Sequence, residues 1–233
     1  MWGDKRISVV LPTYNERDSI RSCIEDFTAL GFVDEIIVVN NNAAPGTDDE
    51  VRQTGARLVY EARQGYGFAV QKGLRTATGD YIVLSEPDGT FEARDILKLI
   101  AYADDFDVVL GSRTVANMIW EGANMNFFLK WGNWAVAKMI EVLFNGTNLT
   151  DVGCTMRLIK KEALVGILDK FAVGGNHFSP EFIILSLVSG LKVTMIPVNY
   201  KRRVGVSMGS GSTLGAIRIA LGMIGLILKY RLE

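Results

Sequence analysis

The stretch that decides the fold is Tyr81-Ile82-Val83-Leu84, followed at once by Ser85-Glu86-Pro87-Asp88-Gly89. A short apolar run that ends at turn residues is typical of a strand buried on both faces. Two carboxylates one residue apart, on the loop that leaves such a strand, suit a hard divalent cation such as Mg²⁺ or Mn²⁺. Pro-Asp-Gly is also ordinary turn chemistry, so this loop alone leaves both a metal site and a solvated turn open.

Strands and helices alternate on both sides of this run. The apolar patterns predict strands at 7–11, 35–39, 57–60 and 107–110, and helices at 16–30, 47–55, 68–76 and 96–103. Thr47-Asp48-Asp49-Glu50 has the pattern of a capping box that opens the second helix. The alternation predicts an α/β fold with a mostly parallel sheet and helices on both faces. Ligands of open sheets of this kind bind at the carboxyl ends of the strands.

The second half departs from this rhythm. The patterns predict a helix at 126–144, strands at 155–159 and 193–198, and a basic, glycine-rich loop at 201–211. Ser179-Pro180-Glu181 predicts a helix with Ser179 as its cap and Pro180 at its first position. A final apolar stretch at 214–228 is, at 1.5 Å per residue, roughly 22 Å long, against about 30 Å of bilayer hydrocarbon. With Arg218 inside it, this stretch is typical of an amphipathic helix in a membrane interface. Burial of the helix against the sheet or a dimer partner is equally compatible with the pattern.

The composition excludes some classes of function. A net charge of −1 and a pI near 6.0 give no electrostatic argument for nucleic-acid binding. A hydrophobic content of 48% and a mean hydropathy of +0.19 indicate a surface that meets lipid or an apolar partner, and a homodimer is compatible with this. Cys23 and Cys154 are too few for a disulfide framework or a zinc site. Because residues 1–6 show no signal-peptide pattern, the expected compartment is cytoplasmic.

Four loops are expected to gather at the carboxyl edge of the sheet. They comprise residues 12–16, 40–42, 63–67 and 86–88. Gly65 and Gly67 allow a backbone to approach closely, just before a helix N-terminus that favours anions. Each loop is a weak signal alone, and their order along four successive strands is much more specific.

These motifs resemble the family 2 glycosyltransferases of GT-A fold. The resemblance rests on VVLPTYNE at 9–16, IIVV at 36–39, G-x-G-x-A-x-x-x-G at 65–73, A-x-G-D at 77–80, E-x-D at 86–88 and GSR at 111–113. The nearest branch is that of the dolichyl- or polyprenyl-phosphate sugar synthases, which DVGCTMR at 151–157 and RVGVSM at 203–208 resemble. The resemblance therefore extends over roughly residues 7–208.

The resemblance implies an inverting, metal-dependent glycosyltransferase. A sugar would move from a nucleotide diphosphate donor, of the GDP-mannose or UDP-glucose type, to a polyprenyl or dolichyl phosphate at the cytoplasmic membrane face. Glu86 and Asp88 would bind Mg²⁺ or Mn²⁺, and Asp88, Arg113 and Arg203 would be catalytic. The other residues expected around the donor are Pro12, Tyr14, Glu16, Asn40, Asn41, Gly67, Gln71, Lys130 and Ser207.

The same resemblance predicts the domain organisation. We expect one domain over residues 1–233, with a nucleotide-sugar-binding half at 1–113, an acceptor-binding half at 114–211 and an interfacial helix at 212–233. Four positions depart from the family pattern, in three places. Asn40 and Asn41 replace two Asp residues, Glu86 replaces the first metal-binding Asp, and Met208 replaces a Lys.

Two alternatives remain open at this level. A transferase acting on the hydroxyl of a glycan or small molecule would need a general base, for which Asp151 and Glu181 are candidates. Each carboxylate also has a structural interpretation, as a turn cap and as a first-turn helix residue respectively. A non-catalytic nucleotide-sugar-binding protein would fit the Asn substitutions. His177, without a second ligand at metal-binding spacing, is expected to be structural or to lie beside the acceptor.

Overall fold

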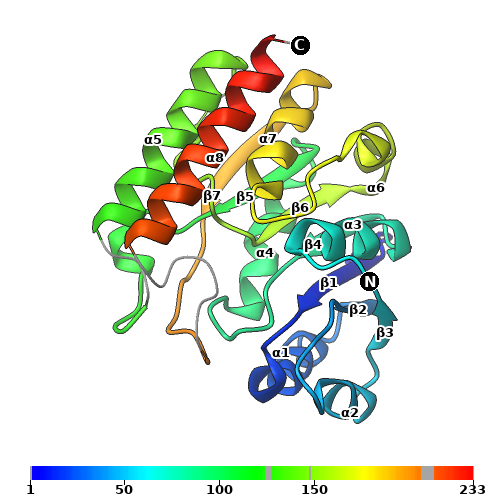
Figure 1. Cartoon of the computed structure of the whole chain (residues 1–233). Coiled ribbons are helices and arrows are strands. Elements are labelled where there is room, and N and C mark those ends of the chain that lie inside the picture. The colour runs from blue at the N-terminus through cyan, green and yellow to red at the C-terminus, as the bar shows by residue number, and fades with distance from the viewer. Residues whose placement is uncertain (1, 124–126, 147, 206–212, 233) are drawn as a thin grey trace.

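The computed structural model describes residues 2–123, 127–146, 148–205 and 213–232, and the predicted alternation of strands and helices is confirmed (Figure 1). The first half contains β1 (Ile7–Thr13), α1 (Arg17–Ala29), β2 (Glu35–Asn40), α2 (Thr47–Arg52), β3 (Arg57–Tyr60), α3 (Tyr66–Thr76) and β4 (Tyr81–Leu84). The rest contains η1 (Ala93–Asp95), α4 (Ile96–Tyr102), β5 (Val108–Ser112), η2 (Ala116–Met118), α5 (Phe127–Leu143), β6 (Arg157–Lys160), α6 (Lys161–Val165), η3 (Leu168–Lys170), α7 (Phe178–Val188), β7 (Val193–Pro197) and α8 (Thr213–Leu232).

The seven strands form one sheet in the order β3-β2-β1-β4-β6-β5-β7. The pairs β1–β2, β1–β4, β2–β3 and β5–β7 are parallel, and β6 runs antiparallel to both β4 and β5. The predicted α/β class with a mostly parallel sheet is therefore confirmed. Because β6 returns between β4 and β5, its first residue, Arg157, lies opposite Leu84 at the carboxyl end of β4.

Both faces of the sheet are covered by helices. Val10 of β1 packs in a core with α3, α5, α7 and α8, whereas Val9 and Leu11 pack in a second core with α1 and α4. All three side chains are completely buried. The alternation of faces along a wholly apolar run is what a strand covered on both sides requires.

The caps of two helices differ from the predictions. The capping box is wrong, because Gly46 in a left-handed conformation (φ +87°) caps α2, while the hydroxyl of Thr47 donates to the carbonyl of Ala44 (2.7 Å). The predicted cap of α7 is also wrong, because α7 begins at Phe178. Ser179 lies within the first turn of α7, where its hydroxyl accepts a hydrogen bond from Arg157 (2.9 Å).

The C-terminal helix α8 lies between α5 and α7 (Figure 1) and is 20 residues long. Its Met223 and Ile227 are buried against the core, whereas Leu221 and Leu228 are 63% and 47% exposed. Within the described part of the chain, no helix combines the length and the apolarity that crossing a bilayer would need.

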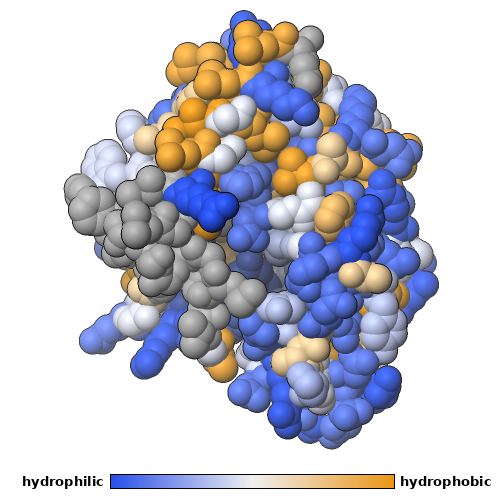
Figure 2. Space-filling model, viewed as in Figure 1, coloured by the Kyte–Doolittle hydropathy of each residue, from blue (hydrophilic) through white to orange (hydrophobic). Residues whose placement is uncertain are grey.

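Hydrophobic side chains gather on the surface over α5 and α8 (Figure 2). On α5 the exposed ones are Trp131, Trp134 and Val142, and the two indole rings contact each other edge to face. We call these three residues, together with Leu221 and Leu228, the apolar patch. Exposed aromatic and aliphatic side chains in such numbers are typical of a surface that meets lipid or another protein.

Candidate functional site

The first three predicted loops do meet at the carboxyl edge of the sheet, and Asn41 joins them. Its backbone N–H donates to the carbonyl of Thr13 (3.0 Å), and its amide donates to the carbonyls of Glu61 and Arg63 (2.8 Å each). Its amide oxygen accepts from the backbone of Gly65 (2.8 Å). The buried amide of Asn41 thus fixes the loop at 63–67, which we call the glycine-rich loop from here on. We infer that Asn41 would affect a bound donor only indirectly, through this loop.

Asn40, which like Asn41 replaces an Asp of the family pattern, lies beside a carboxylate. Its amide donates to Asp48 (2.6 Å), which also accepts from the hydroxyl of Tyr60 (2.8 Å). Asp48 was not among the predicted site residues. The helix start at 47–50 was its only signal, because the contact crosses from the end of β2 to α2.

Glu16 organises the loop that follows β1. One of its carboxylate oxygens accepts from the backbones of Tyr14 (2.7 Å) and Asn15 (2.9 Å) and from the hydroxyl of Thr13 (3.2 Å). Pro12 is buried within β1, and Tyr14 is half-buried beyond its end. Glu16 therefore fixes the backbone on which Tyr14 is placed.

The acidic pair after β4 converges on one cation. Arg203 places one guanidinium nitrogen 2.7 Å from Asp88 and another 3.2 Å from Glu86. The second oxygen of Asp88 accepts from the backbone (2.9 Å) and the hydroxyl (2.6 Å) of Thr90. Asp88 is buried and Glu86 is half-buried, so the two acids and Arg203 share one partly enclosed position.

The loop that carries Arg203 is bound to the acidic loop through the backbone. Val204 donates to the carbonyl of Asp88 (2.8 Å), and Lys201 donates to the carbonyl of Thr90 (2.7 Å). On the other side, the hydroxyl of Ser19 in α1 donates to the carbonyl of Pro87 (2.6 Å). The acidic loop is therefore held between α1 and the segment 201–204.

The charges at this position perturb one another. Burial, and then the neighbouring Asp88, raise the pKa of Glu86 from 4.5 to about 8, against the opposing effect of Arg203. Burial alone would lower the pKa of Arg203, but the charges of Glu86 and Asp88 outweigh it and raise that pKa. Two carboxylates that repel each other and share one cation are typical of a site for a small positive ion.

The donor set fits a divalent cation. Both acids turn oxygens toward the position that the Arg203 guanidinium takes, and oxygen ligands are those that Mg²⁺ and Mn²⁺ prefer. Among the described residues, no third acid, His or Cys joins them in a cluster. A metal on Glu86 and Asp88 would therefore complete its coordination with water and with oxygens of a bound substrate, as Mg²⁺ commonly does.

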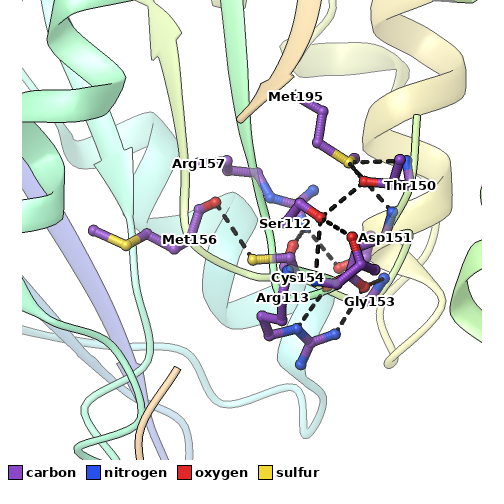
Figure 3. Close-up of polar contacts among 11 residues, drawn as sticks. Ser112, Arg113, Thr150, Asp151, Gly153, Cys154, Met156, Arg157 and Met195 are labelled. Carbon is purple, nitrogen blue, oxygen red and sulfur yellow. Dashed lines mark hydrogen bonds and ion pairs between the residues drawn. The ribbon is translucent and has the colours of Figure 1, made fainter. Parts of the chain in front are cut away.

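Arg113 is paired with Asp151 rather than exposed to solvent (Figure 3). The guanidinium donates two parallel hydrogen bonds to the carboxylate (2.8 and 2.9 Å), and the backbone N–H of Arg113 donates a third (2.9 Å). Gly153 donates a fourth from its backbone (3.0 Å). Burial alone would lower the pKa of Arg113, but Asp151 outweighs it and raises that pKa well above its ordinary value.

Neighbouring hydroxyls extend this pair (Figure 3). The hydroxyl of Ser112, at the end of β5, lies 2.8 Å from that of Thr150, and the backbone N–H of Thr150 donates to the sulfur of Met195 in β7 (3.1 Å). The segment 150–153 is thereby fixed to β5 and β7. The Arg113 side chain is only 12% exposed, and the face of its guanidinium lies over the ring of Tyr200 (5.1 Å). Arg113 lies near enough to the acidic loop for its charge to act against the raised pKa of Glu86.

Arg157 is a second guanidinium, completely enclosed beneath the acidic loop. It donates to the carbonyl of Cys154 and to Ser179 (2.9 Å), and it lies over the ring of Phe182 (4.9 Å). Its two other nitrogens, Nε and Nη1, have no hydrogen-bond partner among the described residues. Burial lowers the pKa of Arg157.

The segment 172–174, which no sequence pattern marked as functional, supports the glycine-rich loop. Gln71 donates from its side chain to the carbonyl of Val173 (3.0 Å), and a Cβ at Gly67 would lie 2.3 Å from that same oxygen. Gly67 and Gln71 therefore face this segment. We infer that they shape a donor site mainly by fixing the backbone around it.

The remaining predicted residues are placed as follows. Lys130 lies half-buried in the first part of α5, and Ser207 and Met208 lie outside the described residues. Glu181 and Asp151, the two candidate bases, are both buried with their carboxylates hydrogen-bonded. The ring of His177 lies 3.2 Å from the carbonyl of Ile219 in α8, which is a structural contact.

Comparisons with known proteins identify the family. The model of glycosyl transferase family 2 matches residues 8–168. An uncharacterised glycosyltransferase of Mycobacterium tuberculosis is 31% identical over 229 residues, which cover 93% of this chain and 95% of that relative. A dolichyl-phosphate hexose transferase of Haloferax volcanii is 28% identical, over 85% of this chain and 84% of its own.

The fold agrees with solved structures. That of glucosyl-3-phosphoglycerate synthase from Mycobacterium tuberculosis, in complex with Mn²⁺, UDP and phosphoglyceric acid, superposes with a TM-score of 0.73. The match covers 98% of this chain and 79% of that one at 19% identity, so it supports the fold alone. Taken with the sequence matches, it leads to one conclusion: the chain is a glycosyltransferase and belongs to glycosyl transferase family 2.

Proposed function

We propose that this enzyme moves a hexose from a nucleotide diphosphate sugar to the phosphate of a polyprenyl or dolichyl phosphate, with inversion at the sugar carbon and with Mg²⁺ or Mn²⁺. The observation that carries the proposal is the convergence of Glu86, Asp88 and Arg203 at the carboxyl edge of the sheet. Similar solved structures contain Mn²⁺ or Mg²⁺ with UDP, which supports a metal and a nucleotide here.

The glycine-rich loop supplies the second half of a donor site. Gly65 and Gly67 precede and open α3, whose N-terminal N–H groups attract anions. The loop is fixed to the end of β2 by Asn41, so its backbone is preorganised. A diphosphate that lies between this loop and the acidic pair could direct oxygens both to the N–H groups of the loop and to a cation on the acidic pair.

The chemistry required of the protein is mainly electrostatic. An acceptor phosphate oxygen forms a bond to the sugar C1 as the bond from C1 to the diphosphate oxygen breaks, and the electron pair leaves with the nucleotide diphosphate. Arg203 lies where it can stabilise the charge that develops on that leaving group. A divalent cation on Glu86 and Asp88 would supply Lewis-acid stabilisation of the same charge.

The surroundings of Asp151 and Glu181, the two candidate general bases, favour a phosphate over a hydroxyl as the acceptor group. Asp151 accepts four hydrogen bonds from Arg113 and Gly153, and Glu181 is completely buried, so neither is open to a hydroxyl substrate. A phosphate is already an anion near neutral pH and needs no base. The dolichyl-phosphate hexose transferase among the relatives supports the same acceptor class.

The apolar patch supplies a surface for the lipid part of such an acceptor. Trp131 and Trp134 are 50% and 39% exposed on α5, and α5 packs against α8, which carries the exposed Leu221 and Leu228. Tryptophan is enriched where proteins meet the membrane interface. We therefore expect peripheral contact with the cytoplasmic membrane face, which flotation with anionic liposomes at low salt would detect.

The main experiment compares acceptors and a metal-site variant. Wild-type enzyme is incubated with UDP-glucose or GDP-mannose, Mn²⁺, and either polyprenyl phosphate, polyprenol or 3-phosphoglycerate, and products are identified by mass spectrometry. We expect transfer to polyprenyl phosphate and a loss of about 10²-fold or more in turnover for Asp88→Asn. The exposed Asp104→Asn is the control that keeps wild-type turnover.

Each half of the proposal can fail separately. Transfer to 3-phosphoglycerate or to polyprenol, with none to polyprenyl phosphate, would refute the acceptor class and leave the donor site intact. Wild-type turnover by Asp88→Asn would refute the metal site.

A further inference from the structure

Glu181 connects two parts of the molecule that lie far apart in sequence. Although it is completely buried, one of its oxygens accepts from the hydroxyl of Tyr230 (2.7 Å), in the last turn of α8. The same oxygen accepts from the backbone of Ala172 (3.0 Å), and the backbone of Val173 lies within hydrogen-bond distance of both oxygens (3.0 and 3.1 Å). Glu181 thus ties α8 to the segment 172–174.

The segment 172–174 in turn supports the glycine-rich loop. The backbone of Phe68 donates to the carbonyl of Gly174 (3.1 Å), and Gln71 donates to that of Val173 (3.0 Å). The contact is close packed, since a Cβ at Gly65 would lie 2.2 Å from the oxygen of Gly174. Any displacement of the segment must therefore move the start of α3.

The position of α8 is fixed by a second contact close to the first. A Cβ at Gly222 would lie 2.4 Å from Nε2 of His177, so the helix backbone is seated directly against this ring. His177 immediately precedes α7, four residues before Glu181. Leu221 and Leu228 of the apolar patch are exposed on α8.

We propose that Glu181 is a positioning residue that couples the seating of α8 to the order of the glycine-rich loop. The link to catalysis rests on the proposed function, in which that loop binds the donor diphosphate. Coupling between two sites is reciprocal, so a nucleotide that orders the loop must stabilise the seated α8 by the same factor. The residues that carry the coupling are Tyr230, Glu181, Val173 and Phe68.

Tyr230→Phe tests the coupling because it removes one hydroxyl and keeps the ring. The matched control is Tyr102→Phe, on a side chain of α4 that is 45% exposed. Hydrogen exchange is measured without any ligand. We expect the amides of Val173 and Phe68 to exchange about fivefold faster in Tyr230→Phe, with strand β4 unchanged, because local openings differ from global unfolding.

Nucleotide binding provides the second measurement. With Mn²⁺ present, the dissociation constant for UDP or GDP is expected to rise about fivefold in Tyr230→Phe and to stay unchanged in Tyr102→Phe. In wild type the nucleotide should also slow amide exchange in α8, and Tyr230→Phe should abolish this effect. The KM for the donor should rise, while the KM for the acceptor stays the same.

The outcomes separate this inference from the proposed function. Wild-type exchange at Phe68 and Val173 in Tyr230→Phe overturns the coupling, whatever the nucleotide does. A uniform acceleration that includes β4 also overturns it, since that would be a plain loss of stability. A wild-type protein that binds neither nucleotide refutes the proposed donor site, while faster local exchange would still establish the coupling.

Discussion

Asp151→Asn tests how strongly Arg113 depends on its partner. Each carboxylate oxygen of Asp151 accepts two hydrogen bonds, one oxygen from the backbone and Nε of Arg113, the other from Nη2 of Arg113 and the backbone of Gly153. Asparagine keeps the shape but has one acceptor oxygen, so two of these bonds are lost whichever way the amide faces. The Arg113 side chain, only 12% exposed, is then left without a countercharge.

The expected cost is large. Removing one partner of a buried ion pair costs about 3–5 kcal/mol of the free energy of unfolding. With a denaturant dependence of about 2 kcal/mol/M in urea, the midpoint of unfolding should fall by roughly 1.5–2.5 M. The control is Asp169→Asn, whose side chain is 94% exposed in its pair with Arg75, and its cost should stay below about 1 kcal/mol.

A double variant separates stability from activity. Asp151→Asn combined with Arg113→Met removes both charges, so the double variant should regain part of the stability that Asp151→Asn loses. We still expect it to be inactive, since the guanidinium near the acidic loop is gone. A midpoint for Asp151→Asn equal to that of wild type, or strictly additive effects in the double variant, would show that Arg113 does not depend on Asp151.

Three further variants probe the same edge of the sheet. Gly67→Ala puts a Cβ 2.3 Å from the backbone oxygen of Val173 and should lower the free energy of unfolding by about 1–3 kcal/mol in urea titrations; wild-type stability would contradict the close packing. Because the pKa of Glu86 is raised from 4.5 to about 8 by burial and by Asp88, the folded protein loses stability as pH rises through that window. Glu86→Gln removes this loss, so its thermal midpoint should exceed that of wild type by more at pH 8 than at pH 5, and an equal difference would argue against the raised pKa. Arg157→Met removes a buried guanidinium, two of whose nitrogens have no hydrogen-bond partner among the described residues, so the free energy of unfolding in urea should stay unchanged or rise. A large loss of stability would indicate that Arg157 has partners beyond those described.

The positions of the strands along the chain were predictable because most strands are short apolar runs between turn residues. The bounds predicted for β3 and β4 agree with the structure at both ends. The caps predicted for α2 and α7 were wrong for a common reason. Local capping patterns compete with neighbouring chemistry, such as the left-handed Gly46 before α2 and the Arg157 side chain beside Ser179.

The sequence predicted which loops meet but not what each polar side chain does there. Parallel strands bring their carboxyl ends to one edge, so the loops at 12–16, 40–42, 63–67 and 86–88 follow from the strand order. The partners of Asn41 depend on how a turn 20–24 residues later is folded, and no spacing rule encodes that. The amide of Asn41 therefore binds the backbone of Glu61, Arg63 and Gly65.

Contacts between distant segments were the hardest to predict. Gln71 and Val173 are separated by 102 residues, and Arg203 and Glu86 by 117. The segment 172–174 is Ala-Val-Gly and has no side chain that suggests chemistry. Its importance comes only from its backbone carbonyls, which become visible once α3 and α7 are packed together.

The charges at the acidic loop suggest why cation and donor should bind together. Arg203 already compensates Glu86 and Asp88, so a divalent cation placed on the same acids would repel this guanidinium. A donor diphosphate changes the balance, because its negative oxygens can face both the cation and Arg203. Since Val204 and Lys201 bind the backbone of the acidic loop, Arg203 would need only a side-chain movement to exchange the acids for phosphate oxygens. One arginine can therefore hold the acidic pair in place and afterwards stabilise the leaving group.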